Sequence, residues 1–497
     1  MKKYVVFFIS LLLLFSLYSS SIVDNVKKNI YTFTLKNGLK FILYEDHSVP
    51  IATFVTYANI GSSDERIGIY GISHFLEHLA FKGTRVIGTK NYKKEKKILK
   101  KMDNVFDEIL KEKDSVKPDK NKIKKLQERL SKLRKEADKY VISNEFDIIL
   151  KKNGGVGLNA GTSNDYTVYY FSLPSNRIEL WAYLESKRFS DPVFREFYKE
   201  KEVIKEERRL RTENSPIGKL IEEMLSVSFK EQPYHISVIG PMSNINHITR
   251  DDVKQYFREH YNANNIVIGV AGDVYLNDLK KLAKKYFSYI PAGKKSLLNY
   301  TVDPPQLGEK TTTLYEDSQP WLIIGYHCPA ETHKDFIKFE IFNYLFTSGR
   351  SSRLYKKLVV KNKSAMYVGS FAGFPGTKYP SLYIIFTLPN SGHTNKELED
   401  VIFKEIDKLK GNKISEKELE SAKKRYLLNQ FKELKSKQSL LIKLLSSEVI
   451  NGSWERVFDF VDEVKKIGVN DMQDFVKKYF KKRFRVIAKI EKKGGKK

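Results

Sequence analysis

The 497-residue sequence predicts an α+β protein built from two related halves, each an antiparallel sheet with helices on one face. Its length exceeds what one hydrophobic core usually supports, and its content of 41% hydrophobic residues is ordinary for a globular protein. A helix-like stretch at 251–261 precedes a strand-like stretch at 266–269, and the same order recurs at 470–480 and 485–488. This recurrence indicates a duplicated architecture.

The first residues are typical of a secretory signal peptide. Lys2 and Lys3 precede an apolar run at 4–17, and a stretch of serines at 19–21 follows. We expect residues 1–21 to be removed and the mature protein to be exported, to the periplasm or the medium. Because the run is shorter than the roughly 20 residues of a membrane span, membrane association is expected only if this segment stays uncleaved.

The first half is expected at residues 22–290. Four strands are predicted in it, with helices between them, at 31–35, 40–44, 52–60 and 167–173. The turn Asn37-Gly38 joins the first two strands into a hairpin. Residues 291–308 contain three prolines and show little periodicity, so we expect a linker there and the second half at 309–497.

Residues 91–143 are a Lys- and Glu-rich insertion in the first half. Apolar residues recur in it at three- and four-residue steps, in two stripes separated by Pro118: Leu99, Met102, Phe106 and Ile109, then Ile123, Leu126, Leu130, Leu133, Ala137 and Tyr140. We expect an antiparallel helical hairpin. Because this heptad-striped insertion is distant in sequence from the metal ligands predicted below, we expect a docking element rather than a part of the chemistry.

Composition excludes several classes of site. Cys328 is the only cysteine, so no intrachain disulfide can form and a thiol-based metal or catalytic site lacks support. The formal net charge is +28, but the lysines are spread along the chain and no nucleic-acid-binding motif accompanies them. We therefore expect no nucleic-acid partner, while attraction to anionic membrane surfaces or acidic substrates stays open.

The sequence His74-Phe75-Leu76-Glu77-His78 predicts a metal-dependent hydrolytic site. On a helix, residues four apart share a face, so His74 and His78 can offer imidazole nitrogens to one metal ion while Glu77 lies beside them. Zinc in catalytic sites has three protein ligands and one position for water, whose proton a neighbouring carboxylate can take. The alternative, two histidines packed in a helix, predicts no third ligand in a suitable place.

This motif, followed by Leu-Ala-Phe-Lys-Gly-Thr at 79–84, resembles the pitrilysin family of inverted-motif (HxxEH) zinc metallopeptidases. That family includes insulin-degrading enzyme and the mitochondrial processing peptidases, and the resemblance extends over nearly the whole mature chain. It implies one zinc ion per chain and an endopeptidase with Glu77 as its catalytic base. Such an enzyme hydrolyses peptides or unfolded polypeptides in a cleft between two homologous halves.

The resemblance also implies a third metal ligand on a later helix. The stretch 200–209 matches the family pattern and assigns the ligand role to Glu207 and a supporting role to Glu200, with Glu206 as the chief competitor for the ligand. Seven residues are close to two helical turns, so Glu200 and Glu207 point to one side of a helix. Taken alone, this stretch would be interpreted as a charged surface helix.

A glycine-rich stretch at 153–163 leads into an alternating strand at 166–171. It resembles the family segment that borders the cleft and holds the substrate, which implies substrate contacts from Asn159 and Ala160. An exposed strand edge can pair with an extended peptide through backbone hydrogen bonds. The alternative is a glycine-rich turn that precedes a core strand.

The second half carries no metal motif of its own. Residues 339–347, where a second HxxEH helix would lie, contain no histidine, and Leu427 takes the place of the third ligand. We therefore expect a single metal site per chain.

Active members of the family supply an arginine and, seven residues later, a tyrosine from the second half. Tyr367 is the candidate for the substrate-binding tyrosine here, but Val360 stands where the arginine would be. Arg350 and Arg353 are alternative donors, although they lie well before Tyr367. We therefore expect a homo- or heterodimer in which a paralogous subunit supplies an Arg–Tyr pair. The alternative function is a non-catalytic zinc-binding subunit that scaffolds a paralogous peptidase.

Overall fold

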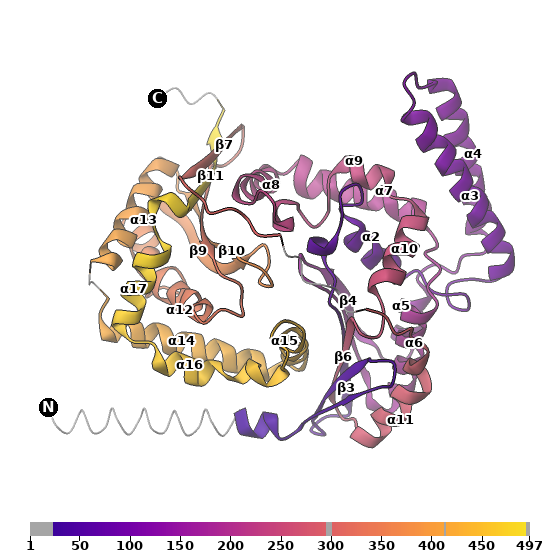
Figure 1. Cartoon of the computed structure of the whole chain (residues 1–497), viewed down its shortest axis with the longest axis horizontal. Coiled ribbons are helices and arrows are strands. Elements are labelled where there is room, and N and C mark those ends of the chain that lie inside the picture. Colours follow the sequence, from indigo (N-terminus) through magenta and orange to yellow (C-terminus); the bar gives the residue numbers. More distant parts are fainter. Residues whose placement is uncertain (1–22, 295–300, 412–413, 494–497) are drawn as a thin grey trace.

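A computed structural model describes residues 23–294, 301–411 and 414–493. The chain forms two α/β sandwiches side by side, each a sheet with helices packed against it (Figure 1). This arrangement confirms the predicted α+β class and the two related halves. The expected signal segment and part of the expected linker lie outside the described residues.

The first half contains a six-stranded sheet in the order β1-β2-β6-β3-β5-β4. Its strands are β1 (Ile30–Thr34), β2 (Lys40–Glu45), β3 (Ile51–Ala58), β4 (Val156–Thr162), β5 (Thr167–Pro174) and β6 (Ile266–Gly272). The strands β1 and β2 form the predicted hairpin, and Gly38 in its turn has a φ of 94°, a conformation that strains other residues.

Most helices of the first half lie on the side of its sheet that faces away from the second half (Figure 1). They are α2 (Ile72–Leu79), α3 (Tyr92–Lys113), α4 (Lys120–Asp138), α5 (Glu145–Lys152), α6 (Ile178–Ser190), α7 (Phe197–Arg208), α8 (Pro216–Ser228), α9 (Met242–His247), α10 (Arg250–His260) and α11 (Leu276–Tyr286). None of the helices within the described residues is both long and apolar enough to cross a membrane.

The second half repeats this plan with five strands in the order β7-β11-β8-β10-β9. Its strands are β7 (Lys310–Glu316), β8 (Trp321–Cys328), β9 (Ala365–Phe374), β10 (Ser381–Pro389) and β11 (Arg485–Lys492). Its helices are α12 (Phe336–Phe346), α13 (Asn395–Lys410), α14 (Glu416–Lys435), α15 (Lys437–Ile450), α16 (Phe460–Lys466) and α17 (Val469–Tyr479). The predicted repeat corresponds to α10–β6 in the first half and α17–β11 in the second.

Both sheets are mainly antiparallel, as predicted, and each also contains one parallel pair that was not predicted, β2 with β6 and β7 with β11. The reason is geometric. In each half the last strand lies between two earlier strands that run in opposite directions: β6 lies between β2 and β3, and β11 lies between β7 and β8. A strand in such a position must run parallel to one of its two neighbours.

The two halves exchange helices across their interface. Helix α8 of the first half packs on β11 and β7, and α15 of the second half packs on β6 and β3. Two glycines allow this close approach: a side chain at Gly325 would meet Met224 of α8, and one at Gly269 would meet Leu441 and Leu445 of α15. The exchange buries leucine-rich faces of both helices and joins the halves into one body.

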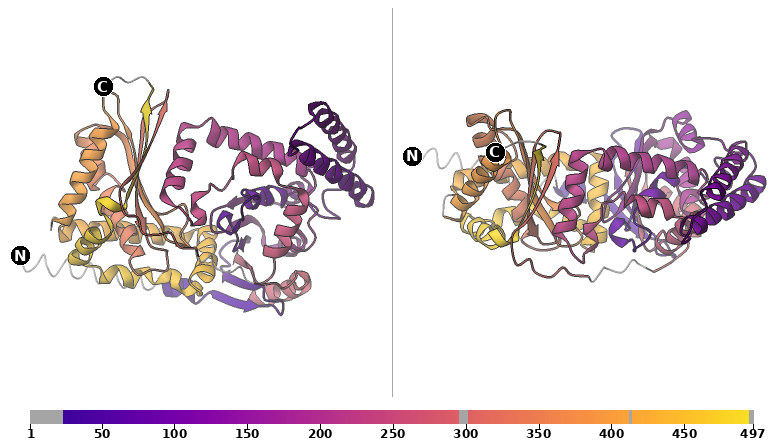
Figure 2. Two further views of the ribbon diagram at one scale, coloured as in Figure 1. Left: turned by 45° about the horizontal axis from the view of Figure 1, so that its top comes forward. Right: turned by 90° about the horizontal axis from the view of Figure 1, so that it is seen from above.

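The insertion forms the predicted hairpin of α3 and α4, at the end of the molecule opposite the second half (Figure 2). The stripe on α3 is buried as expected, and Val105 and Ile109 pack against Leu126 of α4. Helix α3 also packs against α7, where Asp103 accepts a hydrogen bond from Tyr198. The hairpin therefore contacts the helix in which a metal ligand is predicted.

Candidate metal centre

Helix α2 presents the HxxEH residues from a buried position. Its N-terminus begins at Gly71, and the buried carboxylate of Glu65 accepts hydrogen bonds from the amides of Gly71 and Ser73 at 2.7 and 2.8 Å. These bonds satisfy amides that have no partner inside the helix. The result is a fixed helix with His74 buried and His78 half-buried.

Helix α7 brings Glu207 to the two histidines. Its Oε1 lies 3.6 Å from His74 Nε2, and its Oε2 lies 3.5 Å from His78 Nε2. One ligand atom from each of the three residues lies within 4.8 Å of the others. Three ligand atoms bonded at about 2.1 Å to a tetrahedral ion lie roughly 3.4 Å apart, so this group fits a divalent cation such as zinc.

The two imidazoles differ in their electrostatic surroundings. Burial and the neighbouring His78 lower the pKa of His74 to about 4, which keeps His74 in the neutral form that binds metals. Burial acts in the same direction on His78, but hydrogen bonds and charges from Glu200 and Glu207 outweigh it and raise the pKa of His78 to about 9. Metal binding would therefore displace a proton from His78.

Glu200 lies where it can orient His78. Its Oε2 is 3.4 Å from His78 Nδ1, and its Oε1 is 2.7 Å from Lys82 Nζ. Although burial opposes the shift, these two partners lower the pKa of Glu200 and keep it ionised. A carboxylate at the second nitrogen of a histidine fixes the tautomer that ligates through the first.

The structure separates the two candidate glutamates of α7. Glu206 is 57% exposed and pairs with Arg209 at 2.9 Å, pointing to solvent. Glu207 is 16% exposed and also contacts Arg211. The geometry thus brings Glu207, and not Glu206, to the histidines.

Glu77 lies beside the metal-binding group without being part of it. Thr162 on β4 donates a 2.6 Å hydrogen bond to Glu77 Oε2, and burial raises the pKa of Glu77. The pairing of a carboxylate with a fixed hydroxyl holds the candidate base in one position. Sequence reasoning missed Thr162, although it stands in the glycine-rich stretch that leads to the cleft.

The predicted substrate residues Asn159 and Ala160 lie on β4, the edge strand of the first sheet. The exposed Asn159 side chain accepts a hydrogen bond from the Ala160 amide at 2.9 Å. Within the described residues β4 pairs only with β5, which leaves its other edge open. The same strand therefore offers a backbone edge to a peptide and ends at Thr162, next to Glu77.

The second-half residues predicted for substrate binding lie on or next to β9, the edge strand of the second sheet. Tyr367 is 48% exposed on the edge strand β9, where its ring covers Gly369, and Val360 is 53% exposed in the preceding helical turn. Arg353 is bound to Glu418 through its Nε and Nη2 atoms, which gives it a structural partner.

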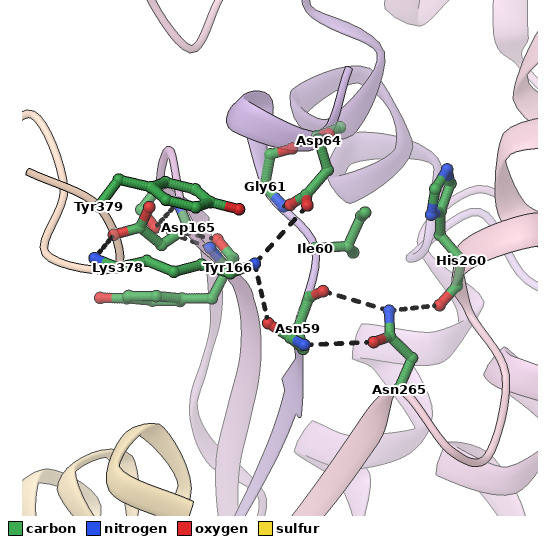
Figure 3. Close-up of polar contacts among 12 residues, drawn as sticks. Asn59, Ile60, Gly61, Asp64, Asp165, Tyr166, His260, Asn265, Lys378 and Tyr379 are labelled. Carbon is green, nitrogen blue, oxygen red and sulfur yellow. Dashed lines mark hydrogen bonds and ion pairs between the residues drawn. The ribbon is translucent and has the colours of Figure 1, made fainter. Parts of the chain in front are cut away.

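A loop of the second half anchors the turn that follows β4 (Figure 3). Asp165 accepts hydrogen bonds from the Thr377 and Lys378 amides at 2.6 and 3.1 Å and from the Tyr234 hydroxyl at 2.5 Å. Lys378 then reaches Asp64 with its Nζ 3.6 Å from Oδ1. No sequence motif predicted this buried junction. Its central residue, Asp165, lies three residues after Thr162.

Two family profiles match the chain. The profile described as insulinase (peptidase family M16) matches residues 40–106, which include the HxxEH motif, and the profile described as peptidase M16 inactive domain matches residues 247–426. The matched segments therefore include parts of both halves.

Curated relatives carry names of zinc proteases. The chain is 28% identical to zinc protease PqqE of Helicobacter pylori, over 90% of this chain and 89% of that protein. It is 23% identical to a zinc protease named YmxG of Bacillus subtilis, over 91% of this chain and 96% of the relative. It is also 24% identical to the mitochondrial-processing peptidase subunit beta of Saccharomyces cerevisiae, over 52% of this chain and 45% of that subunit.

Solved structures share the fold. A protease from Helicobacter pylori superimposes with a TM-score of 0.77 at 25% identity, covering 93% of this chain and 99% of the other. The periplasmic protease PqqL from Escherichia coli gives a TM-score of 0.69 at 16% identity, over 93% of this chain and 47% of that one. Together with the HxxEH helix and the duplicated halves, these matches show that the chain belongs to the M16 peptidase family, the family of pitrilysin, insulin-degrading enzyme and the mitochondrial processing peptidases.

Proposed function

We propose that this protein is a zinc-dependent endopeptidase with one metal site per chain. The observation that carries the proposal is the convergence of His74, His78 and Glu207, from two helices far apart in the sequence, beside a Glu77 held by Thr162. Metal ligands without a base would suggest a structural site. A buried carboxylate next to an open metal-binding group instead supports hydrolysis.

Each residue has a distinct role in this proposal. Bound zinc would supply a Lewis acid that polarises the peptide carbonyl and acidifies water at the site. Glu77 accepts the proton of the attacking water and later gives it to the leaving amine. Thr162 holds Glu77, and Glu200 orients His78.

The proposed substrates are short peptides or unfolded polypeptides. A chain in extended conformation can add to the open edge of β4 through backbone hydrogen bonds, with Asn159 and Ala160 beside it. Because such pairing uses the main chain, it selects for extended conformation more than for particular side chains. In a folded protein most strands are already paired within a sheet, which favours unfolded substrates.

The second candidate function is a zinc-binding subunit that scaffolds a paralogous peptidase. The observation that favours it is the exposed Val360 in place of the arginine that active members supply. The matching profile of the second half also describes an inactive domain. Both candidates share the metal site and differ in whether this chain hydrolyses peptides.

We further propose an exported, periplasmic or secreted location. Support comes from the signal-like residues 1–21 and from the fold shared with PqqL, which is a periplasmic protease.

The substitution Glu77→Gln tests the proposed activity. The amide keeps the shape of the side chain but cannot take a proton, so we expect one zinc per chain as before and a loss of peptide hydrolysis of about a hundred- to ten-thousandfold. The measurements are metal content and cleavage of an unstructured fluorogenic peptide, with and without a chelator. Near-normal turnover by Glu77→Gln would contradict the assignment of the base, and a chain without bound zinc would contradict the metal site.

A further inference from the structure

The helical hairpin of residues 91–143 contains a fully buried acidic residue, Glu95, in the first turn of α3. Buried carboxylates are rare unless they are paired, and Glu95 pairs with Arg195. Arg195 Nε lies 2.8 Å from Glu95 Oε1 and Nη2 lies 3.3 Å from Oε2, with both side chains 1% exposed. The insertion therefore places an acidic side chain inside the first half, where it is paired with Arg195.

The remaining donors of Arg195 hold the segment that follows the HxxEH helix. Nη1 donates to the carbonyls of Lys82 and Ile87 at 2.6 and 2.8 Å, and Nη2 donates to the Thr84 carbonyl at 2.6 Å. With the two bonds to Glu95, all five guanidinium N–H groups have acceptors. Residues 82–88 thus fold around a guanidinium that Glu95 helps to orient.

Two glycines show how closely this segment wraps around Arg195. Gly83 and Gly88 have φ values of 89° and 85°, and a Cβ at either position would lie 2.8 Å from Arg195 Nη1. Such contacts do not occur without a shift of the neighbouring atoms. The segment therefore has the shape that the guanidinium imposes on it.

From this segment the contacts continue to a metal ligand. The Lys82 backbone is fixed by Arg195, and its Nζ lies 2.7 Å from Glu200 Oε1. Glu200 Oε2 in turn lies 3.4 Å from His78 Nδ1. An unbroken series of polar contacts therefore runs from Glu95 in the insertion to the imidazole of His78.

A second set of contacts supports α7 from the side opposite the metal group. The Phe106 ring of α3 packs on the Tyr198 ring at 5.1 Å, and Lys201 Nζ lies 4.2 Å above the Phe106 ring. Helical periodicity puts Tyr198 on the face of α7 opposite Glu207 and Lys201 about 120° from it. The insertion thus packs behind the helix that carries the third ligand.

We propose that Glu95 is a positioning residue of the metal centre and that the hairpin is part of the support of this site. The inference rests on the proposed function, because it takes His74, His78 and Glu207 as zinc ligands. Glu95 touches neither metal nor substrate. It acts through Arg195, Lys82 and Glu200, whose arrangement sets the orientation of His78.

The test compares Glu95→Gln with Glu108→Gln in the full-length chain. Both substitutions lie on α3, but Glu108 is exposed and its nearest cation is Arg129 at 3.8 Å on the hairpin itself. We expect Glu95→Gln to weaken zinc binding about tenfold, the lower end of the loss typical for a direct partner of a metal ligand, and Glu108→Gln to leave it unchanged. Zinc affinity is measured by competition with a chromophoric chelator, alongside the absorption spectrum of the cobalt-substituted protein and thermal unfolding of the metal-free chain.

A folded Glu95→Gln chain with lowered thermal stability but unchanged zinc affinity and cobalt spectrum would overturn the proposal, since that pattern belongs to a purely structural ion pair. Where Glu95→Gln does not fold, Glu95→Asp keeps the charge and shortens the side chain by one methylene. Weaker zinc binding by Glu95→Asp supports positioning, and unchanged binding overturns it. Failure of the parent chain to bind zinc would instead refute the proposed function.

Discussion

Glu206 and Glu207 are adjacent in the sequence but experience opposite surroundings, because neighbours on a helix point about 100° apart. Glu207 faces two imidazoles, whereas Glu206 faces solvent and Arg209. We predict that Glu207→Gln weakens zinc binding by more than the ten- to hundredfold typical of a partner of a ligand. The matched substitution Glu206→Gln should leave it unchanged. Zinc content after dialysis against a weak chelator measures the difference, and equal losses in both variants would contradict the ligand assignment.

Thr162 determines where the carboxylate of Glu77 points. We predict that Thr162→Val lowers kcat about tenfold, because a hydrogen bond to a charged group typically contributes about 1.5 kcal/mol or more. Zinc content should not change, since Thr162 contacts no ligand in the group. Thr162→Ser keeps the hydroxyl and serves as the control. Equal kcat values for the parent chain and Thr162→Val would show that the hydrogen bond does not position the base.

At the residue scale, the sequence predicted correctly the relative directions of side chains that lie on the same helix. The spacing of His74, Glu77 and His78 fixes their relative directions as soon as the helix forms, and the same holds for Glu200 and Glu207. Thr162 meets Glu77 across 85 positions, and this contact depends on β4 lying at the sheet edge next to α2. No local pattern encodes that placement, which is why Thr162 and the Asp165 junction were not predicted.

At the scale of elements, the repeat of a helix followed by a strand correctly predicted two halves, but not how their elements connect. The last strand of each half inserts between two earlier strands, and this insertion creates the parallel pairs β2–β6 and β7–β11. The exchange of α8 and α15 was also unpredictable. An apolar face predicts that a helix is buried, but it does not predict which sheet the helix packs against. The same limit applies to the hairpin, whose stripe predicted two paired helices and not the contact of α3 with α7.

Strand β8 carries His327, whose pKa gives a prediction for acid stability. Burial, with a smaller effect from Lys310, lowers the pKa of His327 to about 4, and its Nε2 lies 3.0 Å from Gln306 Oε1. His327 binds a proton near pH 6.5 in the unfolded chain but only near pH 4 in the folded chain. Above pH 6.5 His327 therefore does not lower the free energy of unfolding, and this free energy falls by up to roughly 3 kcal/mol as the pH drops from 6.5 to 4.

We accordingly expect His327→Gln to remove this part of the acid destabilisation. Denaturant unfolding at pH 7 and pH 4.5 measures it, with His393→Gln on an exposed turn as the control. A parent chain and a His327→Gln chain that lose equal stability between these pH values would contradict the assignment.

The whole molecule joins its halves in two ways that act on the same region. The exchanged helices bury apolar faces, whereas the Asp165 junction supplies directional hydrogen bonds from the loop after β9 to the turn after β4. Because Thr162 lies three residues before Asp165, the second half fixes the end of the strand that holds Glu77. The candidate metal-binding group lies in the first half, and contacts from both halves hold the proposed base Glu77.

At the scale of the whole molecule, we expect a donor for the oxyanion to come from outside this chain. Loss of one such donor typically costs about a hundred- to a thousandfold in turnover, and this chain has the exposed Val360 where active family members have an arginine. We propose that a paralogous subunit supplies an Arg–Tyr pair to the zinc site of this chain.

The purified chain alone should therefore bind zinc and hydrolyse peptides weakly, with about a hundredfold gain in kcat when the partner is added. If the partner supplies the pair, Tyr367→Phe in this chain should change the activity of the complex little, while substitution of the partner's arginine should abolish the gain. Turnover is measured with a fluorogenic peptide, and complex formation by sedimentation. Full activity from a homogeneous preparation of this chain, lost on changing Arg350, would refute the proposal and assign the donor role to that residue.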